Sequence, residues 1–163
     1  QQHAHLLHVG DSRIYLLRQQ QLAQLTRDHR VWRGSQSYLS QALGATAELN
    51  ADYHSLKLQC NDLFLLATDG LFETLPQPAL LALLNSPQQD LNTLAQQLAE
   101  AAYDAGSDDN ISLQLIRVEA LPQLPQAALF TGQQHQQRDR MDRDGGGEGG
   151  DAAAVDAGVG TVG

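Results

Sequence analysis

Residues 63–73 decide the fold, and they read Leu63-Phe64-Leu65-Leu66-Ala67-Thr68-Asp69-Gly70-Leu71-Phe72-Glu73. The first five are apolar without interruption, which is typical of a strand that is buried on both faces. The apolar run gives way to a carboxylate, Asp69, and the residues after it favour a helix. A buried strand holds its end rigidly, and a metal ligand or a catalytic acid needs such a rigid support. Asp69 is therefore either a functional acid or the N-cap of the following helix, a position that aspartate also favours.

The composition is that of a soluble protein with an excess of acid. The chain of 163 residues suits one domain of ordinary size, and 19 acidic against 10 basic residues give a net charge of −9. Lys57 is the single lysine, which argues against nucleic acid as a partner. The single cysteine, Cys60, forms no internal disulfide. Since no apolar run approaches the roughly 20 residues of a membrane span, we expect a cytoplasmic protein without a membrane partner.

The chain divides into two unequal parts. Residues 1–120 carry the apolar periodicity, and residues 121–163 form a low-complexity tail. Nine of the fourteen glycines lie from Gly132 onward, and the tail shows neither a helical nor a strand period. A segment of this kind buries too little apolar surface to offset the entropy lost on ordering, so we predict that the tail is disordered.

The first part predicts an α+β fold, with helices on a mainly antiparallel sheet. Short alternating or apolar runs predict strands, and they lie at residues 5–9, 13–18, 22–25, 52–58, 63–67 and 111–118. Helices are expected at residues 37–43, 79–84 and 90–104. The last of these is the clearest, because Asp90 is placed to cap its start and Gly106 to end it in a left-handed conformation.

Carboxylates gather where the predicted strands begin or end. Asp11 lies in the first hairpin turn, Asp69 and Glu73 follow the buried strand, and Asp109 precedes the last strand. If the strands at 63–67 and 111–118 are antiparallel neighbours, Asp69 and Asp109 face each other at one edge of the sheet. Carboxylates that close repel one another unless they are protonated or a cation neutralises them, and Mg²⁺ and Mn²⁺ prefer oxygen ligands. Aspartate is also an ordinary turn residue, and for any single one of them local hydrogen bonding is the better explanation.

Three histidines near the start of the chain have the composition of a metal cluster. Strand alternation, however, places His8 on the opposite face from His3 and His5. We therefore interpret this segment as a strand with a polar face.

Five motifs resemble, in order and spacing, those of the metal-dependent serine/threonine protein phosphatases of type 2C. They read His8-Val9-Gly10-Asp11-Ser12-Arg13-Ile14-Tyr15, Leu25-Thr26-Arg27-Asp28-His29, Leu39-Ser40-Gln41-Ala42-Leu43-Gly44, Asp62-Leu63-Phe64-Leu65-Leu66-Ala67-Thr68-Asp69-Gly70 and Gly106-Ser107-Asp108-Asp109-Asn110-Ile111-Ser112. The resemblance covers roughly residues 3–118 and is to the carboxyl-terminal portion of the domain in its bacterial form.

The resemblance implies a two-layer antiparallel β-sandwich flanked by helices, incomplete at the N-terminus, with two or more Mn²⁺ or Mg²⁺ ions. Matched by position, Asp69, Asp109, Asp11 and Glu73 correspond to metal ligands, and no further catalytic residue is assigned. Gly70, Ser107 and Asn110 correspond to residues that shape the supporting loop. The implied reaction is hydrolysis of phosphoserine or phosphothreonine in proteins by a metal-activated water, with phosphoproteins and a cognate serine/threonine kinase as partners.

Part of the family pattern is missing from this chain. The family's amino-terminal half supplies an arginine that holds phosphate, an Asp-Gly pair that binds metal and a histidine proposed as general acid. Two hypotheses therefore stay open. The chain is either the carboxyl-terminal portion of an active phosphatase, or a non-catalytic, phosphatase-like remnant that serves as a regulatory binding module.

Overall fold

The computed structural model describes residues 2–33, 36–40, 50–86, 90–122 and 154–162. Within these ranges the strands are β1 (His3–His8), β2 (Arg13–Arg18), β3 (Gln21–Gln24), β4 (Arg30–Arg33), β5 (Gln36–Leu39), β6 (Asp52–Lys57), β7 (Leu63–Ala67), β8 (Ile111–Ala120) and β9 (Ala154–Val162). The helices are α1 (Asp69–Phe72), α2 (Gln77–Leu84) and α3 (Leu91–Asp104). Of the described helices, none is long and apolar enough to cross a membrane.

The main sheet has five strands in the order β3-β2-β7-β8-β9, and all its neighbours are antiparallel. The apolar strand β7 lies at the centre, as the sequence predicts, and pairs with β2 on one side and β8 on the other. Ala67 at the end of β7 is paired with Arg13 at the start of β2 and with Leu113 near the start of β8. The segments that follow β7 and precede β2 and β8 therefore meet at one edge of the sheet.

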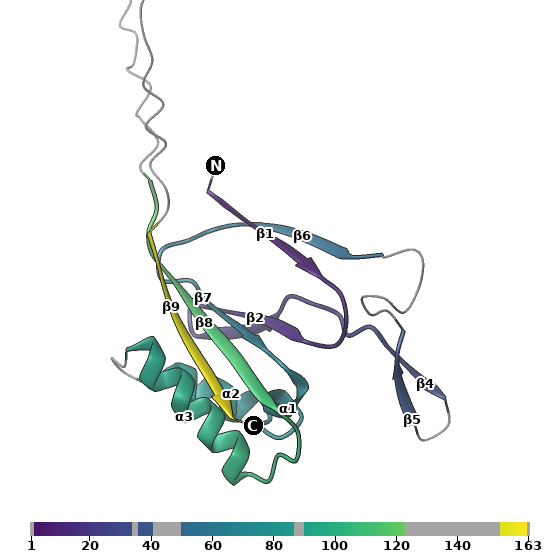
Figure 1. Cartoon of the computed structure of the whole chain (residues 1–163). Coiled ribbons are helices and arrows are strands. Elements are labelled where there is room, and N and C mark those ends of the chain that lie inside the picture. The colour runs from purple at the N-terminus through teal and green to yellow at the C-terminus, as the bar shows by residue number, and fades with distance from the viewer. Residues whose placement is uncertain (1, 34–35, 41–49, 87–89, 123–153, 163) are drawn as a thin grey trace, which may run out of the picture.

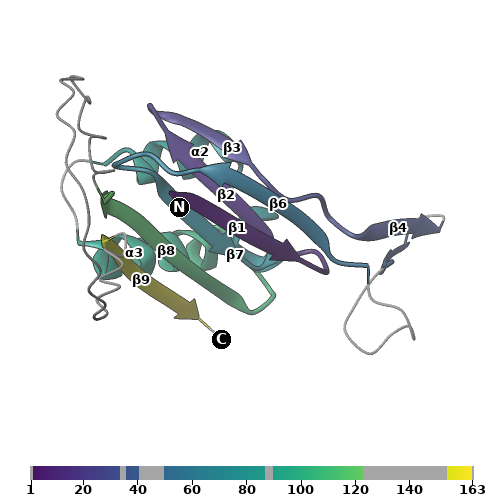
Figure 2. The same cartoon turned by 90° about the horizontal axis from the view of Figure 1, so that it is seen from above.

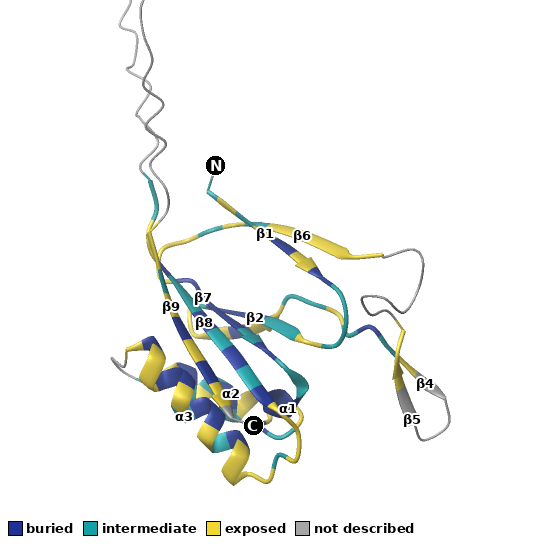
Figure 3. Cartoon of the chain, viewed as in Figure 1, coloured by how far each residue is buried: buried dark blue, intermediate teal, exposed yellow. Residues whose placement is uncertain are grey.

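The helices pack on one face of this sheet and form the larger core (Figure 1). Helix α3 turns an apolar stripe inward, and Leu98 on that stripe is fully buried together with Leu65 of β7 and Leu115 of β8. The stripe repeats at three- and four-residue spacing, which keeps it on one side of a helix. Figure 3 shows the buried side of α3 toward the sheet and its exposed side toward solvent.

The other face of the main sheet is covered by the two-stranded sheet β1–β6 (Figure 2). A smaller apolar cluster, with Phe64 and Val118 buried at its centre, joins this pair to the main sheet, and Ala4 of β1 and Leu56 of β6 pack against it. The prediction of a two-layer antiparallel sandwich flanked by helices is confirmed. In the described residues the second layer is thin, because only β1 and β6 form it.

Helix α3 begins and ends as predicted. The Asp90 side chain accepts hydrogen bonds from the backbone N–H groups of Asn92 and Thr93, both at 3.0 Å. Gly106 has a positive φ of 93°, a left-handed conformation that a residue with a side chain rarely adopts. Local sequence signals therefore set both ends of this helix.

The helix predicted at residues 37–43 is wrong where the structure can test it. Gln36–Leu39 is strand β5, which pairs with β4 in a hairpin, and residues 41–49 lie outside the described residues. Tyr38 is paired with Val31, and aromatic and β-branched residues fit a strand better than a helix. The partner strand, which the sequence pattern does not reveal, decides the outcome.

The prediction of a tail without regular structure is wrong for Ala154–Val162. These residues form strand β9, the outermost strand of the main sheet, beside β8. Residues 123–153 lie outside the described residues. A glycine-rich strand fits here because α3 passes directly over it. A Cβ added at Gly158 would lie 2.4 Å from the Leu91 carbonyl, and one at Gly160 would lie 2.4 Å from the Ala95 oxygen. The glycines that make the sequence look disordered allow this close approach.

The packing of β9 under α3 can be tested at Gly160. We expect Gly160→Ala to lower the free energy of unfolding by about 1–3 kcal/mol, because the new methyl group meets helix backbone that cannot move aside. Val159→Ala on the exposed side of the same strand is the control, with an expected change within about 0.5 kcal/mol. Urea unfolding measures both. Equal, small effects would show that β9 does not pack on α3.

Candidate metal centre

The register of the main sheet brings four carboxylates to one edge. Asp69 is the first residue of α1, directly after β7, and Glu73 follows one helical turn later, where its N–H bonds to the Asp69 carbonyl at 2.9 Å. Asp11 lies in the turn between β1 and β2, next to Gly10, whose φ is +108°. Asp109 lies in the loop that leads into β8. The antiparallel pairing of β7 and β8 that the sequence analysis assumed is confirmed.

The loop that carries Asp109 is fixed to the end of β7 by backbone and hydroxyl contacts. The Thr68 hydroxyl donates to the Asn110 carbonyl at 3.1 Å and accepts from the Ser112 N–H at 3.0 Å. The Ser107 hydroxyl donates to the Gly70 carbonyl at 2.8 Å. A Cβ at Gly70 would lie 2.6 Å from the Asn110 oxygen, so the two segments approach too closely for any other residue. Gly70, Ser107 and Asn110 therefore lie together where the end of β7 meets the loop that carries Asp109.

The guanidinium of Arg30 lies among three of the carboxylates. Its Nε donates to Asp11 at 3.0 Å, one terminal nitrogen donates to Asp69 at 2.7 Å, and the other donates to Glu73 at 2.6 Å. Contacts of this length between charged groups are strong hydrogen bonds. The structure therefore brings Asp11, Asp69 and Glu73 together around a positive charge that belongs to the chain itself.

The environment of Asp69 is unfavourable for a negative charge. Burial raises the pKa of Asp69 above its ordinary value, and the charges of Asp11, Asp109 and Glu73 raise it further, against the opposing effect of Arg30. Thr68, and not Asp69, holds the N-cap position of α1 and makes no capping hydrogen bond through its side chain. Asp69 is therefore not an N-cap, and the arrangement around it is that of a cation site.

Arg30 reaches this place because a second ion pair fixes the preceding loop. Asp28 accepts two hydrogen bonds from Arg13, at 2.9 and 2.7 Å, and these contacts lower the pKa of Asp28. The Arg13 guanidinium in turn lies 3.9 Å from the centre of the Phe72 ring. The sequence analysis singled out neither Arg13 nor Arg30. Their signal is weak: Arg13 lies within the first of the five motifs and Arg30 directly follows the second, in a chain with few basic residues.

The four predicted metal ligands are not all in contact with Arg30. Asp109 influences Asp69 through its charge, and its own side chain accepts the Asn110 N–H at 2.7 Å. Its carboxylate is exposed and makes no described hydrogen bond with Arg30. The prediction that Asp69 and Asp109 share one edge of the sheet holds, and Arg30 bonds to the other three carboxylates.

Comparison with known proteins identifies the family. A model of the Stage II sporulation protein E (SpoIIE) family matches residues 1–119. The chain belongs to the SpoIIE family. The serine/threonine phosphatase Stp of Listeria welshimeri is 29% identical over 127 residues, which are 68% of this chain and 50% of that protein. The recognition of a bacterial type 2C phosphatase domain is confirmed.

Solved structures agree on the fold. The protein PppA, described as a key regulatory component of T6SS in Pseudomonas aeruginosa, is 29% identical, with a TM-score of 0.63 over 70% of this chain and 51% of that one. The serine/threonine phosphatase of S. agalactiae is 24% identical, with a TM-score of 0.64 over 69% of this chain and 53% of that one, and supports the fold. The SpoIIE-family chain thus spans about half the length of the relatives it matches.

The charge on Asp69 should make the metal-free protein less stable at neutral pH. A carboxyl whose pKa is raised by folding destabilises the folded state when ionised, and this cost disappears once the pH falls below the ordinary pKa near 3.8. We therefore expect Asp69→Asn to raise the unfolding temperature at pH 7 in a chelating buffer, with no difference below about pH 4. Glu100→Gln on the exposed side of α3 is the control. A lower unfolding temperature for Asp69→Asn at pH 7 would contradict this account.

Proposed function

We propose that this chain is the carboxyl-terminal portion of a protein serine/threonine phosphatase and that its carboxylates Asp11, Asp69, Glu73 and Asp109 hold Mn²⁺ or Mg²⁺. One observation carries the proposal: three of these side chains already surround a cation, the Arg30 guanidinium, at 2.6–3.0 Å. A site that binds one positive charge through carboxylate oxygens offers the hard ligands that Mn²⁺ and Mg²⁺ prefer.

The donor set fits divalent ions better than it fits arginine alone. Asp69 and Asp11 are each about one quarter exposed, so they keep oxygen atoms accessible to an ion that retains some of its water. Burial raises the pKa of Asp69, and the charges of Asp11, Asp109 and Glu73 raise it further against the effect of Arg30, so the ionised form stays disfavoured with one guanidinium charge beside it. A divalent ion supplies two charges at the same place. We infer that the ion and Arg30 compete for these oxygen atoms.

Arg30 is placed so that its side chain can leave the carboxylates without disturbing the main sheet. It opens β4, and the β4–β5 pair is a separate sheet that makes no ladder with the main sheet in the described residues. The side chain is one fifth exposed, so solvent can reach it. Its displacement therefore breaks the hydrogen bonds to Asp11, Asp69 and Glu73 but none in the main sheet. The carboxylates themselves stay on the rigid end of β7 and its neighbours.

Bound divalent ions lower the pKa of a coordinated water and neutralise charge on a phosphoryl group. The residues of this chain position and orient the metal ligands. Thr68, Gly70 and Ser107 fix the distance between the Asp69 and Asp109 segments, and the Arg13–Asp28 pair fixes the approach of Arg30. Phosphoserine or phosphothreonine in proteins is the substrate class, as the names of the relatives suggest, and a serine/threonine kinase is the partner that would supply it.

Activity belongs to the complete domain in this proposal, because the chain spans about half of its relatives. The test is hydrolysis of a phosphothreonine peptide with Mn²⁺ by the chain joined to the remaining half of the domain. We expect Asp69→Asn to lower kcat/KM by about 100-fold or more, as loss of a metal ligand does. Asp104→Asn at the end of α3 is the matched control. Undiminished activity of Asp69→Asn would reject the assignment.

The same assay on the 163-residue chain alone tests the second hypothesis, a non-catalytic binding module. Mn²⁺-dependent turnover by this chain would exclude a non-catalytic binding module. Mn²⁺ binding without turnover would leave the chain as the metal-holding part of the domain.

Competition between Arg30 and the divalent ion gives a second test. Since coupling between two bound cations is reciprocal, removal of Arg30 should strengthen Mn²⁺ binding, by about 5-fold or more. We expect Arg30→Gln to bind Mn²⁺ more tightly in isothermal titration calorimetry and to unfold at a lower temperature in a chelating buffer. Arg27→Gln, an exposed arginine three positions away, is the control. Weaker Mn²⁺ binding by Arg30→Gln would show that Arg30 supports the ion instead of competing with it.

A further inference from the structure

A second group of possible metal ligands lies apart from the four carboxylates. It consists of His8 at the end of β1, His29 in the loop before β4, and Asp52 at the start of β6. One ligand atom of each lies within 4.8 Å of the other two. His8 and His29 are 7% and 9% exposed, and the centres of their rings are 5.0 Å apart. Two imidazoles and a carboxylate form a donor set that suits Zn²⁺ better than Mg²⁺.

His8 is already arranged as a metal ligand. Its Nε2 lies 2.7 Å from the Ser12 carbonyl oxygen, which can only accept a hydrogen bond, so Nε2 carries the proton. In the neutral ring Nδ1 therefore has a free lone pair. Among the described residues, this Nδ1 is the one buried side-chain nitrogen or oxygen that has no hydrogen-bond partner. A backbone carbonyl that fixes the opposite ring nitrogen is the usual support of a metal-bound histidine.

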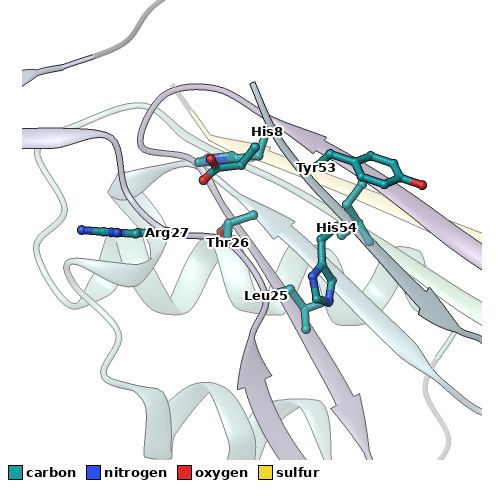
Figure 4. A pocket seen from close by; sticks show the side chains of 8 residues that line it. His8, Leu25, Thr26, Arg27, Tyr53 and His54 are labelled. Carbon is teal, nitrogen blue, oxygen red and sulfur yellow. The ribbon is translucent and has the colours of Figure 1, made fainter. Parts of the chain in front are cut away.

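Asp52 supplies the carboxylate ligand of the group, and its exposure gives an ion access from solvent. Its carboxylate is 56% exposed, and Oδ2 lies 3.0 Å from His29 Nε2. Ligands at 2.0–2.2 Å from a tetrahedral zinc ion are about 3.4 Å apart, so this pair is close to the required spacing. His8 and Asp52 also line a pocket of about 280 Å³. Figure 4 shows His8 in this pocket, across from Tyr53 and His54 of β6.

His29 has to change its tautomer before its Nε2 can bind a metal ion. Its Nδ1 accepts the Gly10 N–H at 3.2 Å, so the neutral ring carries its proton on Nε2 and donates it to Asp52. Zinc takes the position of this proton between Nε2 and Asp52, and the proton moves to Nδ1. The long contact with Gly10 is then given up. Gly10 is only half-buried, so its N–H can bond to water instead.

We propose that His8, His29 and Asp52 form a zinc site that joins the β1–β6 sheet to the loop carrying Arg30. The benefit of such a site follows from the fold. The β1–β6 layer is a two-stranded sheet, which has little stability of its own. An ion held by β1, β6 and the residue before Arg30 would link all three. The site goes beyond the proposed phosphatase function and uses none of its four carboxylates.

The proposal is tested by metal binding alone, on the 163-residue chain freed of metal. Co²⁺ serves as a visible probe of nitrogen ligation, and Zn²⁺ affinity is measured by competition with a coloured chelator. With excess Mg²⁺ present to occupy the four carboxylates, we expect one equivalent of Zn²⁺ to bind and Co²⁺ to give a visible absorption band. Asp52→Asn and His29→Gln should each weaken Zn²⁺ by about 10-fold or more. His3→Gln on the exposed face of β1 and Asp69→Asn should leave the affinity unchanged.

A second variant and a spectroscopic measurement allow the zinc site to be tested even if one variant does not fold. Asp52 is exposed, so Asp52→Asn tests the site even if His29→Gln fails to fold. Nitrogen-15 spectra of the histidine rings should show the His29 proton move from Nε2 to Nδ1 on zinc binding, while His8 keeps its proton on Nε2. The proposal is overturned if Asp52→Asn binds Zn²⁺ as tightly as the unchanged chain. It is also overturned if Asp69→Asn abolishes zinc binding, which would place the ion at the four carboxylates.

Discussion

Repulsion among carboxylates is the constraint on which the rest of this structure depends. Asp11, Asp69 and Glu73 are held at one edge of the main sheet, where burial and mutual charge oppose ionisation of Asp69. Such a cluster persists in a folded protein when one carboxyl keeps its proton or when a positive charge accompanies it. In this chain Arg30 supplies that charge through hydrogen bonds of 2.6–3.0 Å. The sheet supplies the rigidity that keeps the carboxylates from separating.

The rigid and the movable parts of the site come from different elements. Asp69 and Asp109 are fixed by the pairing of β7 with β8 and by contacts through Thr68 and Gly70. Arg30 belongs to the β4–β5 pair, which stands apart from the main sheet. In the proposed exchange of cations, this division lets the carboxylates stay in place while the arginine leaves. In addition, the three successive residues 28–30 each bond to a different part of the structure. Asp28 bonds to Arg13, His29 to Asp52, and Arg30 to the cluster.

The sequence predicts the parts of this fold that depend on local pattern. The apolar run before Asp69, the stripe and caps of α3, and the carboxylates at strand ends all follow from residue type and spacing. Strands β5 and β9 do not. Strand β5 depends on its pairing with β4, which the residue pattern does not reveal, and β9 depends on β8, which lies far away in the sequence. The glycines at 158 and 160 indicate disorder by composition, yet they permit contact with α3. Arg30 was missed because its role arises from three acids brought together only by folding. His8 was placed correctly on its own face of β1, but its neighbours His29 and Asp52 come from other segments.

The central claim is that the four carboxylates form a divalent-cation site that Arg30 occupies in the absence of an ion. Paramagnetic broadening by Mn²⁺ in amide NMR spectra of this chain tests it most directly, because the effect depends on distance from the ion. The account predicts that substoichiometric Mn²⁺ first broadens the amides of Asp11, Gly70 and Asn110, and that the Arg30 Nε–H signal shifts when diamagnetic Mg²⁺ is added instead. Broadening that begins elsewhere, for instance around Asp90 and Glu100, or an Arg30 signal indifferent to Mg²⁺, would contradict it.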